Sequence, residues 1–142
     1  MRIIITGVTG FLGSNIAKGL IKEGNTIFAT HRSSSTFEKC VPFISEINWI
    51  NIDENDWKDQ FRAIKADQLI HAAWDGIGID KRNNWEMQLK NFYLSKEYFD
   101  LAKESGIRKV IAIGSQAEYG SNDFSVNENT PERPNDAYGA VK

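Results

Sequence analysis

The first thirteen residues contain the feature that most constrains how this chain can fold. Ile3 to Thr6 form a short apolar strand that runs directly into a glycine-rich turn, with Gly7, Gly10 and Gly13 at intervals of three. An amphipathic helix then begins near Phe11. Glycines let the backbone approach a phosphate closely, and the free N–H groups and dipole of a helix N-terminus favour negative charge. An ordinary tight turn is the alternative, but the order of strand, turn and helix favours nucleotide binding.

Composition excludes several classes of function. The chain has 142 residues with 17 Lys plus Arg and 19 Asp plus Glu, and it lacks the basic run typical of nucleic-acid binding. Its apolar runs are too short to span a membrane, and a strand that starts at residue 2 leaves no room for a signal peptide. The single cysteine, Cys40, cannot form an internal disulfide. We therefore expect one cytoplasmic domain over residues 1–142 that binds neither nucleic acid nor membranes.

Apolar runs alternate with helical patterns along the rest of the chain. The pattern predicts further strands at 27–30, 47–52, 68–73 and 109–113, and helices at 53–65, at 81–105 and from 135 onward. It also predicts a polar loop with one irregular helical turn at 33–45 and a polar loop at 115–134. This alternation predicts an α/β fold, a doubly wound parallel sheet of strand order 3-2-1-4-5. The ligand crevice of such a sheet lies beyond the carboxyl ends of its first and fourth strands.

The end of the chain carries a candidate proton-transfer site. Tyr138 and Lys142 are four residues apart on the last predicted helix, so their side chains project from one face. A lysine ammonium beside a phenol stabilises the phenolate, which would let Tyr138 exchange a proton near neutral pH. Alone, such a pair is more often part of an amphipathic surface helix. Together with Ser115 at a strand end and the glycine turn, it indicates catalysis.

These segments together resemble the extended short-chain dehydrogenases/reductases, the group of NAD(P)-dependent sugar-nucleotide epimerases and dehydratases. The resemblance extends over essentially the whole chain. It rests on Asp53, Asn91 and the segments TGVTGFLG at 6–13, HAAW at 71–74, GSQAEYG at 114–120 and YGAVK at 138–142. It implies a Rossmann fold and a dinucleotide whose pyrophosphate is held by Gly7, Thr9, Gly10, Phe11, Leu12 and Gly13.

The resemblance also implies roles for residues farther along the cofactor. Asp53 would contact the adenine amino group, although capping of the following helix is a second explanation for an aspartate there. Ala72 and Ala73 would lie beside the nicotinamide ribose. Asn91 would be a buried helix residue near the active site; the alternative is an ordinary polar helix residue.

By the same resemblance, Ser115, Tyr138 and Lys142 form a catalytic triad. Tyr138 would exchange a proton with the hydroxyl or keto oxygen of a sugar, and Ser115 would hydrogen-bond that oxygen. Lys142 would hold the ribose hydroxyls and favour the phenolate. The cofactor would supply the hydride chemistry, while the protein orients and polarises the reactants.

The segment after the second predicted strand bears on the choice of cofactor. A carboxylate about 20 residues past the glycine turn usually binds the ribose 2′-hydroxyl of NAD. Here His31 stands in that place, and Arg32 and Ser33 follow. Arginine matches a phosphate with a bidentate fork. We therefore predict that NADP is preferred over NAD; stacking of Arg32 on adenine in an NAD enzyme is the alternative.

Residues after Ser115 bear on the reaction. Family dehydratases usually carry an acidic pair there, whereas this chain has Gln116 and Ala117, so dehydration is disfavoured. GSQAEYG is similar to the segment of nucleotide 4-keto-6-deoxyhexose reductases, which favours a 4-keto sugar-nucleotide reductase. A sugar-nucleotide 4-epimerase stays open, as does a non-catalytic dinucleotide-binding module on the same fold.

Two further expectations concern what lies around this chain. Family members continue past the position of Lys142 with more strands and a substrate-binding region, so we expect an N-terminal fragment that is inactive alone. The long predicted helix has apolar side chains on two sides, one with Trp85, Leu89 and Phe92 and another with Leu94, Tyr98, Leu101 and Ala102. We expect that helix to form a homodimer contact in the full-length protein.

Overall fold

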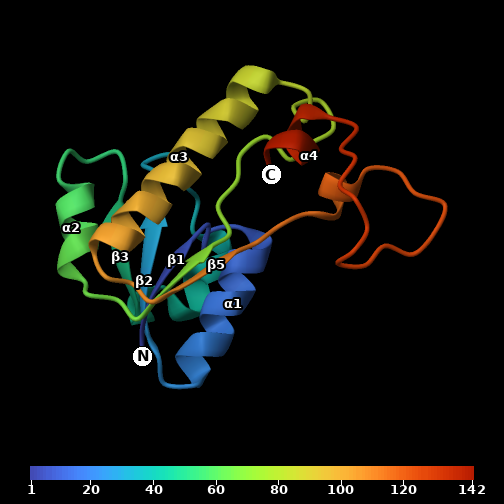
Figure 1. Cartoon of the computed structure of the whole chain (residues 1–142). Coiled ribbons are helices and arrows are strands. Elements are labelled where there is room, and N and C mark those ends of the chain that lie inside the picture. The colour runs from blue at the N-terminus through green and yellow to red at the C-terminus, as the bar shows by residue number, and fades with distance from the viewer. The chain divides into compact units, whose positions relative to one another are not determined.

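The computed structural model describes residues 1–142 and divides into two compact units (Figure 1). The first unit comprises Met1–Ala73 and Glu97–Ile113, and the second comprises Trp74–Lys96 and Gly114–Lys142. The whole parallel sheet belongs to the first unit. The single domain expected over the whole chain stays a prediction. No helix combines the length and the apolar character that a membrane crossing needs.

The first unit is built around a five-stranded parallel sheet of order β3-β2-β1-β4-β5. Its strands are β1 (Arg2–Thr6), β2 (Thr26–His31), β3 (Ile47–Asn51), β4 (Gln68–His71) and β5 (Lys109–Ala112). In the middle of the sheet, Ile5 pairs with Ala29 on one side and with Ile70 on the other. The doubly wound class and the predicted strand order are confirmed, and the order reverses at β1 and β4 as expected.

Helices cover both faces of this sheet because successive side chains of a strand point to opposite faces. One face packs against α1 (Phe11–Lys22) and the 3-10 segment η1 (Glu38–Glu46). The core on that face contains Ile3, Ile5, Val8, Ala17, Ile27, Ala29, Cys40, Phe43, Ile47 and Ile70. The other face packs against α2 (Trp57–Ala63) and the last residues of α3 (Trp85–Glu104) (Figure 1).

Tyr98 of α3 organises this second face. It is 1% exposed, and its hydroxyl donates a hydrogen bond to Oγ1 of Thr30 over 3.1 Å. Its ring contacts those of Trp57, Phe61 and His71, with centroids 5.6, 6.2 and 5.5 Å away. The polar end of the phenol is thus paired inside an apolar layer, as a buried hydroxyl requires.

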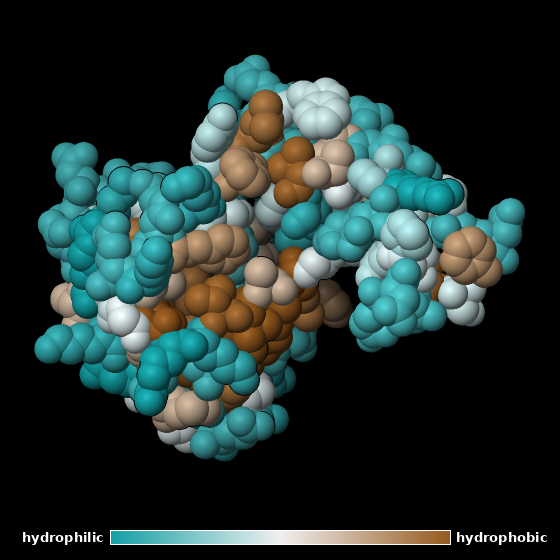
Figure 2. Space-filling model, in the orientation of Figure 1, coloured by the Kyte–Doolittle hydropathy of each residue, from teal (hydrophilic) through white to brown (hydrophobic).

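The β5 strand lies at the edge of the sheet and is only partly covered. Val110 is 43% exposed, and the strand contains no buried residue. Figure 2 shows hydrophobic surface over this region of the first unit, around β5 and α1. An uncovered apolar edge strand is a surface that readily associates with other chains or segments.

In the second unit, the short helices η2 (Gln116–Tyr119) and α4 (Ala137–Val141) pack against each other. A Cβ atom on Gly139 would collide with the Ala117 carbonyl, so only glycine allows this approach. Asp136 caps α4, because its Oδ1 accepts the Gly139 N–H over 2.7 Å. Arg82 donates from Nε to Oδ2 of the same carboxylate, also over 2.7 Å.

Two helix starts differ from the prediction, and one loop holds an unpredicted helix. The long helix begins at Trp85 rather than residue 81, because the Asn84 side chain accepts the Met87 N–H and caps it. Its end is confirmed, since Gly106 follows in the left-handed region with φ +72°. Helix α2 begins at Trp57, four residues later than predicted. The predicted loop after Ser115 contains η2.

The outer side of α3 within the second unit carries exposed apolar side chains. Trp85, Leu89, Phe92 and Tyr93 are 42–64% exposed. This is the surface on which we expected a homodimer contact, and that contact stays a prediction.

The buried phenol of Tyr98 predicts a loss of stability at high pH. Burial raises the pKa of Tyr98 to about 12, from an ordinary value of 10.0. Its stabilising contribution is complete below pH 10.0 and is lost as the pH rises through about 12, because only the unfolded phenol ionises early. We expect the free energy of unfolding to fall by roughly 2–3 kcal/mol over that window.

Urea denaturation at fixed pH values measures this fall. Tyr98→Phe should remove that part of the pH dependence, whereas Tyr93→Phe, at an exposed position on the same helix, should keep it. Equal pH dependence in Tyr98→Phe and the parent protein would contradict the prediction.

Candidate active site

The turn between β1 and α1 brings glycine backbone directly against the end of β4. Gly7 has φ +76°, and a Cβ atom on it would lie 2.7 Å from the Ala73 nitrogen. Gly10 donates its N–H to the Gly7 carbonyl over 3.0 Å, and a Cβ atom on Gly13 would collide with that carbonyl. The turn therefore requires glycine at positions 7 and 13.

The N-terminus of α1 is open to a ligand. Its N-cap residue is Gly10, no side chain caps it, and its first turn has no acidic residue. The first N–H groups of a helix have no partner within that helix. Phe11 and Leu12 are 77% and 44% exposed, and Thr9 is half-buried in the same turn. A backbone cradle at a free helix N-terminus fits the pyrophosphate of a dinucleotide.

Thr6, which the sequence analysis did not single out, holds this cradle to β4. Its side chain is fully buried, and Oγ1 accepts the N–H groups of Ala72 and Ala73 over 3.2 and 3.0 Å. The same oxygen lies 2.8 Å from Nδ1 of His71. The predicted ribose-side residues, Ala72 and Ala73, are therefore fixed beside the glycine turn through their backbone. The sequence signal for this role was a polar residue, Thr6, at the end of an otherwise apolar strand.

The predicted adenosine-side residues are brought together at the ends of β2 and β3. Asp53 accepts the Ser33 N–H on Oδ2 over 2.7 Å, and the Ser33 hydroxyl pairs with the Asn51 amide. The His31 ring packs edge-on against the rings of Phe37 and Trp49. Arg32 lies between His31 and Ser33, so its positive charge is part of this group.

The interactions of Asp53 differ from one of the two explanations given for it. It does not cap α2, whose N-cap is Asp56. Instead, the hydrogen bond from the Ser33 backbone lowers the pKa of Asp53, and the charges of Arg32 and His31 add to that effect. The adenine contact implied by the family resemblance stays a prediction.

In the second unit, Ser115 is the N-cap of η2. Its Oγ accepts the Ala117 N–H over 3.2 Å, and the Glu118 carboxylate accepts the Ser115 N–H over 2.6 Å. This reciprocal capping box uses the serine oxygen as an acceptor. The hydroxyl proton is not used in this capping box.

Of the other two predicted catalytic residues, Tyr138 lies on α4 and Lys142 is its C-cap residue; α4 packs on η2. Tyr138 has the Arg82 guanidinium 4.8 Å from its ring centroid and the Trp74 indole at 6.1 Å, nearly perpendicular. The Lys142 ammonium lies 4.1 Å from the Trp74 ring centroid. Burial lowers the pKa of Lys142, and the Glu118 carboxylate opposes that shift. The structure thus brings all three predicted catalytic residues onto two packed helices of one unit.

Asn91 is buried as predicted, but its side chain is occupied by the loop after β4. Its Oδ1 accepts the Asp75 N–H over 3.0 Å, and its amide donates to the Asp75 carbonyl over 2.9 Å. Gln88, one turn earlier on α3, is fully buried and donates to the Gly76 carbonyl over 3.0 Å. These amides hold the loop rather than point outward, so any role of Asn91 toward the cofactor is indirect.

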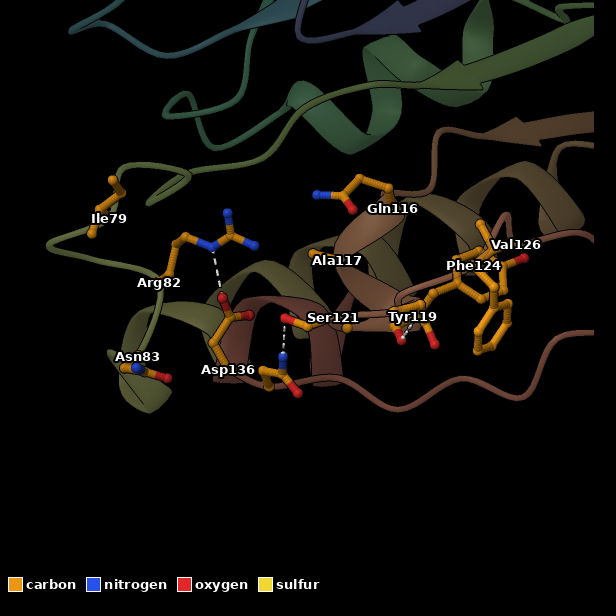
Figure 3. A pocket seen from close by; sticks show the side chains of 13 residues that line it. Ile79, Arg82, Asn83, Gln116, Ala117, Tyr119, Ser121, Phe124, Val126 and Asp136 are labelled. Carbon is orange, nitrogen blue, oxygen red and sulfur yellow. Dashed lines mark hydrogen bonds and ion pairs between the residues drawn. The ribbon is translucent and has the colours of Figure 1, made fainter.

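A cleft of about 680 Å³ lies in the second unit (Figure 3). Its polar lining includes the Arg82–Asp136 ion pair and the amides of Asn83, Gln116, Asn122 and Asn135. Figure 3 shows Tyr119 and Phe124 at the end of the cleft opposite Ile79. Amides, an ion pair and aromatic rings are groups that bind a polyhydroxylated ligand. Neither Arg82 nor Asp136 was predicted as a site residue from the sequence.

The sheet order, the glycine cradle and the Ser–Tyr–Lys set define a class of protein. They are the features of a Rossmann-type dinucleotide-binding protein of the short-chain dehydrogenase kind. The comparison with known proteins identifies the family more narrowly. The chain belongs to the NAD dependent epimerase/dehydratase family, whose model matches residues 3–142.

Individual relatives are similar over the whole of this chain. It is 26% identical to a UDP-glucose 4-epimerase of Streptomyces lividans, over 99% of this chain and 44% of that protein. It is 27% identical to a dTDP-6-deoxy-L-talose 4-dehydrogenase (NAD(+)) of Aggregatibacter actinomycetemcomitans, over 100% of this chain and 52% of that protein. The chain thus spans about half the length of the curated relatives it matches.

The fold is also that of a solved UDP-Glc/GlcNAc 4-epimerase from Campylobacter jejuni. The TM-score is 0.84 at 21% identity, over 99% of this chain and 45% of that one. These findings confirm the predicted family and fold, and they match the expectation that the relatives are longer.

The glycine cradle predicts opposite effects for two similar substitutions on α1. Gly13→Ala places a methyl group against the Gly7 carbonyl and should destabilise the chain by roughly 2–4 kcal/mol. Gly19→Ala meets open space within the same helix and should stabilise it by about 0.5–1 kcal/mol. Chemical denaturation measures both, and dinucleotide titration should show weaker binding for Gly13→Ala alone. Equal stability of the two variants would rule out the described turn.

Proposed function

We propose that this chain provides the dinucleotide-binding half and the proton-transfer residues of an NAD(P)-dependent enzyme that acts on a nucleotide sugar. The observation that carries the proposal is the packing of α4, with Tyr138 and Lys142, on the helix that Ser115 caps. The two curated relatives described above are named for reactions at position 4 of a nucleotide sugar, which supports the same substrate class.

The cradle residues would hold the cofactor. Backbone N–H groups around Gly10 would bind its pyrophosphate, the Asp53 region its adenosine, and the Ala72–Ala73 backbone its second ribose. When bound, the nicotinamide would accept or supply a hydride at the sugar carbon.

The side chains of the second unit would transfer the proton to or from the reacting sugar oxygen. Ser115 would donate its free hydroxyl proton to the reacting sugar oxygen, since its own oxygen already accepts from Ala117. Tyr138 would give a proton to that oxygen or take one from it. Lys142 would bind the ribose hydroxyls and favour the phenolate form. The polar cleft beside η2 would bind the sugar hydroxyls.

Within this chemistry we propose reduction of a 4-keto sugar, because GSQAEYG at 114–120 is similar to the reductase segment. The second candidate is 4-epimerisation, which the similarity to a UDP-glucose 4-epimerase supports. Both reactions use the same proton and hydride transfers. They differ in outcome, since only the reductase consumes reduced cofactor without returning it.

We expect Tyr138→Phe in the full-length protein to lower kcat by roughly 10²–10⁴-fold, because it removes the proton-transfer group. The dissociation constant of the dinucleotide should stay unchanged. Tyr93→Phe, an exposed position on α3, is the matched control and should retain full activity. Two assays are run: cofactor absorbance is followed with reduced cofactor and 4-keto nucleotide sugars, and epimer formation is followed with oxidised cofactor and 4-hydroxyl nucleotide sugars.

Each result has a defined meaning. Full activity in Tyr138→Phe would refute the catalytic assignment. Interconversion of epimers without net cofactor consumption would refute the reductase and support the epimerase.

We further propose NADP(H) as the cofactor, as Arg32 and the absence of a carboxylate at position 31 favour it. Arg32→Ala should then weaken NADP binding by roughly tenfold and leave NAD binding nearly unchanged, since a charge-assisted hydrogen bond to the 2′-phosphate is lost. The Asp53 carboxylate, which accepts the Ser33 N–H, would repel a 2′-phosphate bound beside Ser33. Asp53→Asn removes that negative charge and keeps an oxygen for the Ser33 N–H, so it should strengthen NADP binding. Titration calorimetry with both cofactors tests this, and tighter binding of NAD would refute it.

A further inference from the structure

Trp74 lies against both functional side chains of α4. The Lys142 ammonium is 4.1 Å from the indole centroid. The Tyr138 ring is 6.1 Å away with an interplanar angle of 82°, an edge-to-face contact. The Trp74 side chain therefore contacts both Tyr138 and Lys142.

A hydrogen bond to a buried glutamine of α3 fixes the orientation of the Trp74 indole. Its Nε1–H donates to Oε1 of Gln88 over 2.8 Å. Gln88 is 0% exposed, and its amide nitrogen donates to the carbonyls of Gly76 and Lys81 over 3.0 and 3.3 Å. Rotation of Trp74 would break this hydrogen bond and leave the Gln88 oxygen with only the longer, 3.5 Å hydrogen bond from the Asn91 amide. Loss of one such bond costs about 0.5–1.5 kcal/mol.

Tyr138 is supported on another side by Arg82. The guanidinium lies 4.8 Å from the phenol centroid, and its Nε is bound to Asp136 over 2.7 Å. The four groups therefore form a continuous series of contacts in the order guanidinium, phenol, indole and ammonium. Both aromatic members contact a cation, and cation–π contacts gain strength where water is excluded. Lys142 is half-buried, and burial lowers its pKa.

We propose that Trp74 is a positioning residue for proton transfer: locked by Gln88, its indole sets the direction of the Tyr138 ring and of the Lys142 side chain. The inference rests on the proposed function, because positioning matters only if these two groups react. Trp74 itself touches no reacting atom in this role. The competing explanation is ordinary packing, in which any apolar side chain of similar volume would serve.

Leucine and phenylalanine separate the two explanations. Trp74→Leu keeps an apolar contact but has no π face for the ammonium. Trp74→Phe keeps a π face but lacks the N–H for Gln88. Trp85→Phe, a 56% exposed tryptophan at the start of α3, is the matched control.

Two measurements on the full-length protein give the test. In the first, kcat and KM are measured with the nucleotide-sugar substrate. Trp74→Leu should lower kcat by roughly ten- to a hundredfold, since small misplacements of reacting groups have effects of that size. KM should stay within about twofold, because substrate contacts are unchanged. Trp74→Phe, which keeps the π face but loses the Gln88 hydrogen bond, should recover only part of kcat, and Trp85→Phe should equal the parent.

The second measurement needs no activity. With ¹³C-labelled lysine, the Lys142 ε-CH₂ resonance, assigned by its loss in Lys142→Arg, should be shifted upfield by the indole ring current. Trp74→Leu should abolish the shift, Trp74→Phe should retain part of it, and Trp85→Phe should leave it unchanged. An unchanged Lys142 shift in Trp74→Leu, or equal kcat in the leucine variant and the parent, would overturn the proposal.

The two readouts also separate this inference from the proposed function. An inactive protein with the Lys142 shift intact would refute the proposed function and leave the indole contact standing. An active protein whose Tyr138→Phe variant is inactive, but whose Trp74→Leu variant is unaffected, would refute the positioning role alone.

Discussion

The close approach of the β1–α1 turn to the end of β4 is the contact on which the cofactor-binding part of the chain depends. No side chain fits between Gly7 and the Ala73 backbone, and none fits between Gly13 and the Gly7 carbonyl. The Thr6 hydroxyl, buried below the turn, accepts the two backbone N–H groups of Ala72 and Ala73. Because buried backbone and one buried hydroxyl set this shape, Phe11 and Leu12 are not needed to form it and stay exposed.

In the second unit, two N-cap residues fix the position of the side chains that we assign to proton transfer. Ser115 and Asp136 are both N-caps, and each uses side-chain oxygen to accept a backbone N–H. A capping serine keeps its hydroxyl proton for another partner, so capping and substrate binding are compatible in one residue. A capping aspartate keeps its second oxygen, which here accepts from Arg82. Helix formation therefore orients the groups that we assign to proton transfer.

Local patterns allowed much of this to be predicted, and distant contacts explain the rest. The strands and their order followed from short apolar runs alternating with helical periods, and the glycine spacing located the cradle. The start of α3 was predicted too early, because the charged residues before Asn84 are compatible with a helix. The helix begins only after Asn84, whose side chain caps it by accepting the Met87 N–H. The partner of Asp53 is Ser33, 20 residues away. The local pattern around Asp53 indicated only a cap on the next helix, and the family resemblance added only an adenine contact. The contacts of Trp74 with α4 join segments more than 60 residues apart, which periodicity cannot detect.

The residues that build these sites and the residues that would react in them are largely different. Ser115 and Tyr138 are tied to the fold through their backbone N–H groups, which donate to the Glu118 carboxylate and to the Arg82 carbonyl. Replacing either side chain leaves those bonds in place, although replacing Ser115 also removes the cap that its Oγ provides to η2. Gly139, by contrast, carries no chemistry, yet a Cβ atom there would separate α4 from η2. Substitutions at the reactive side chains can therefore remove activity while the fold persists, whereas substitutions at the packing glycines remove both.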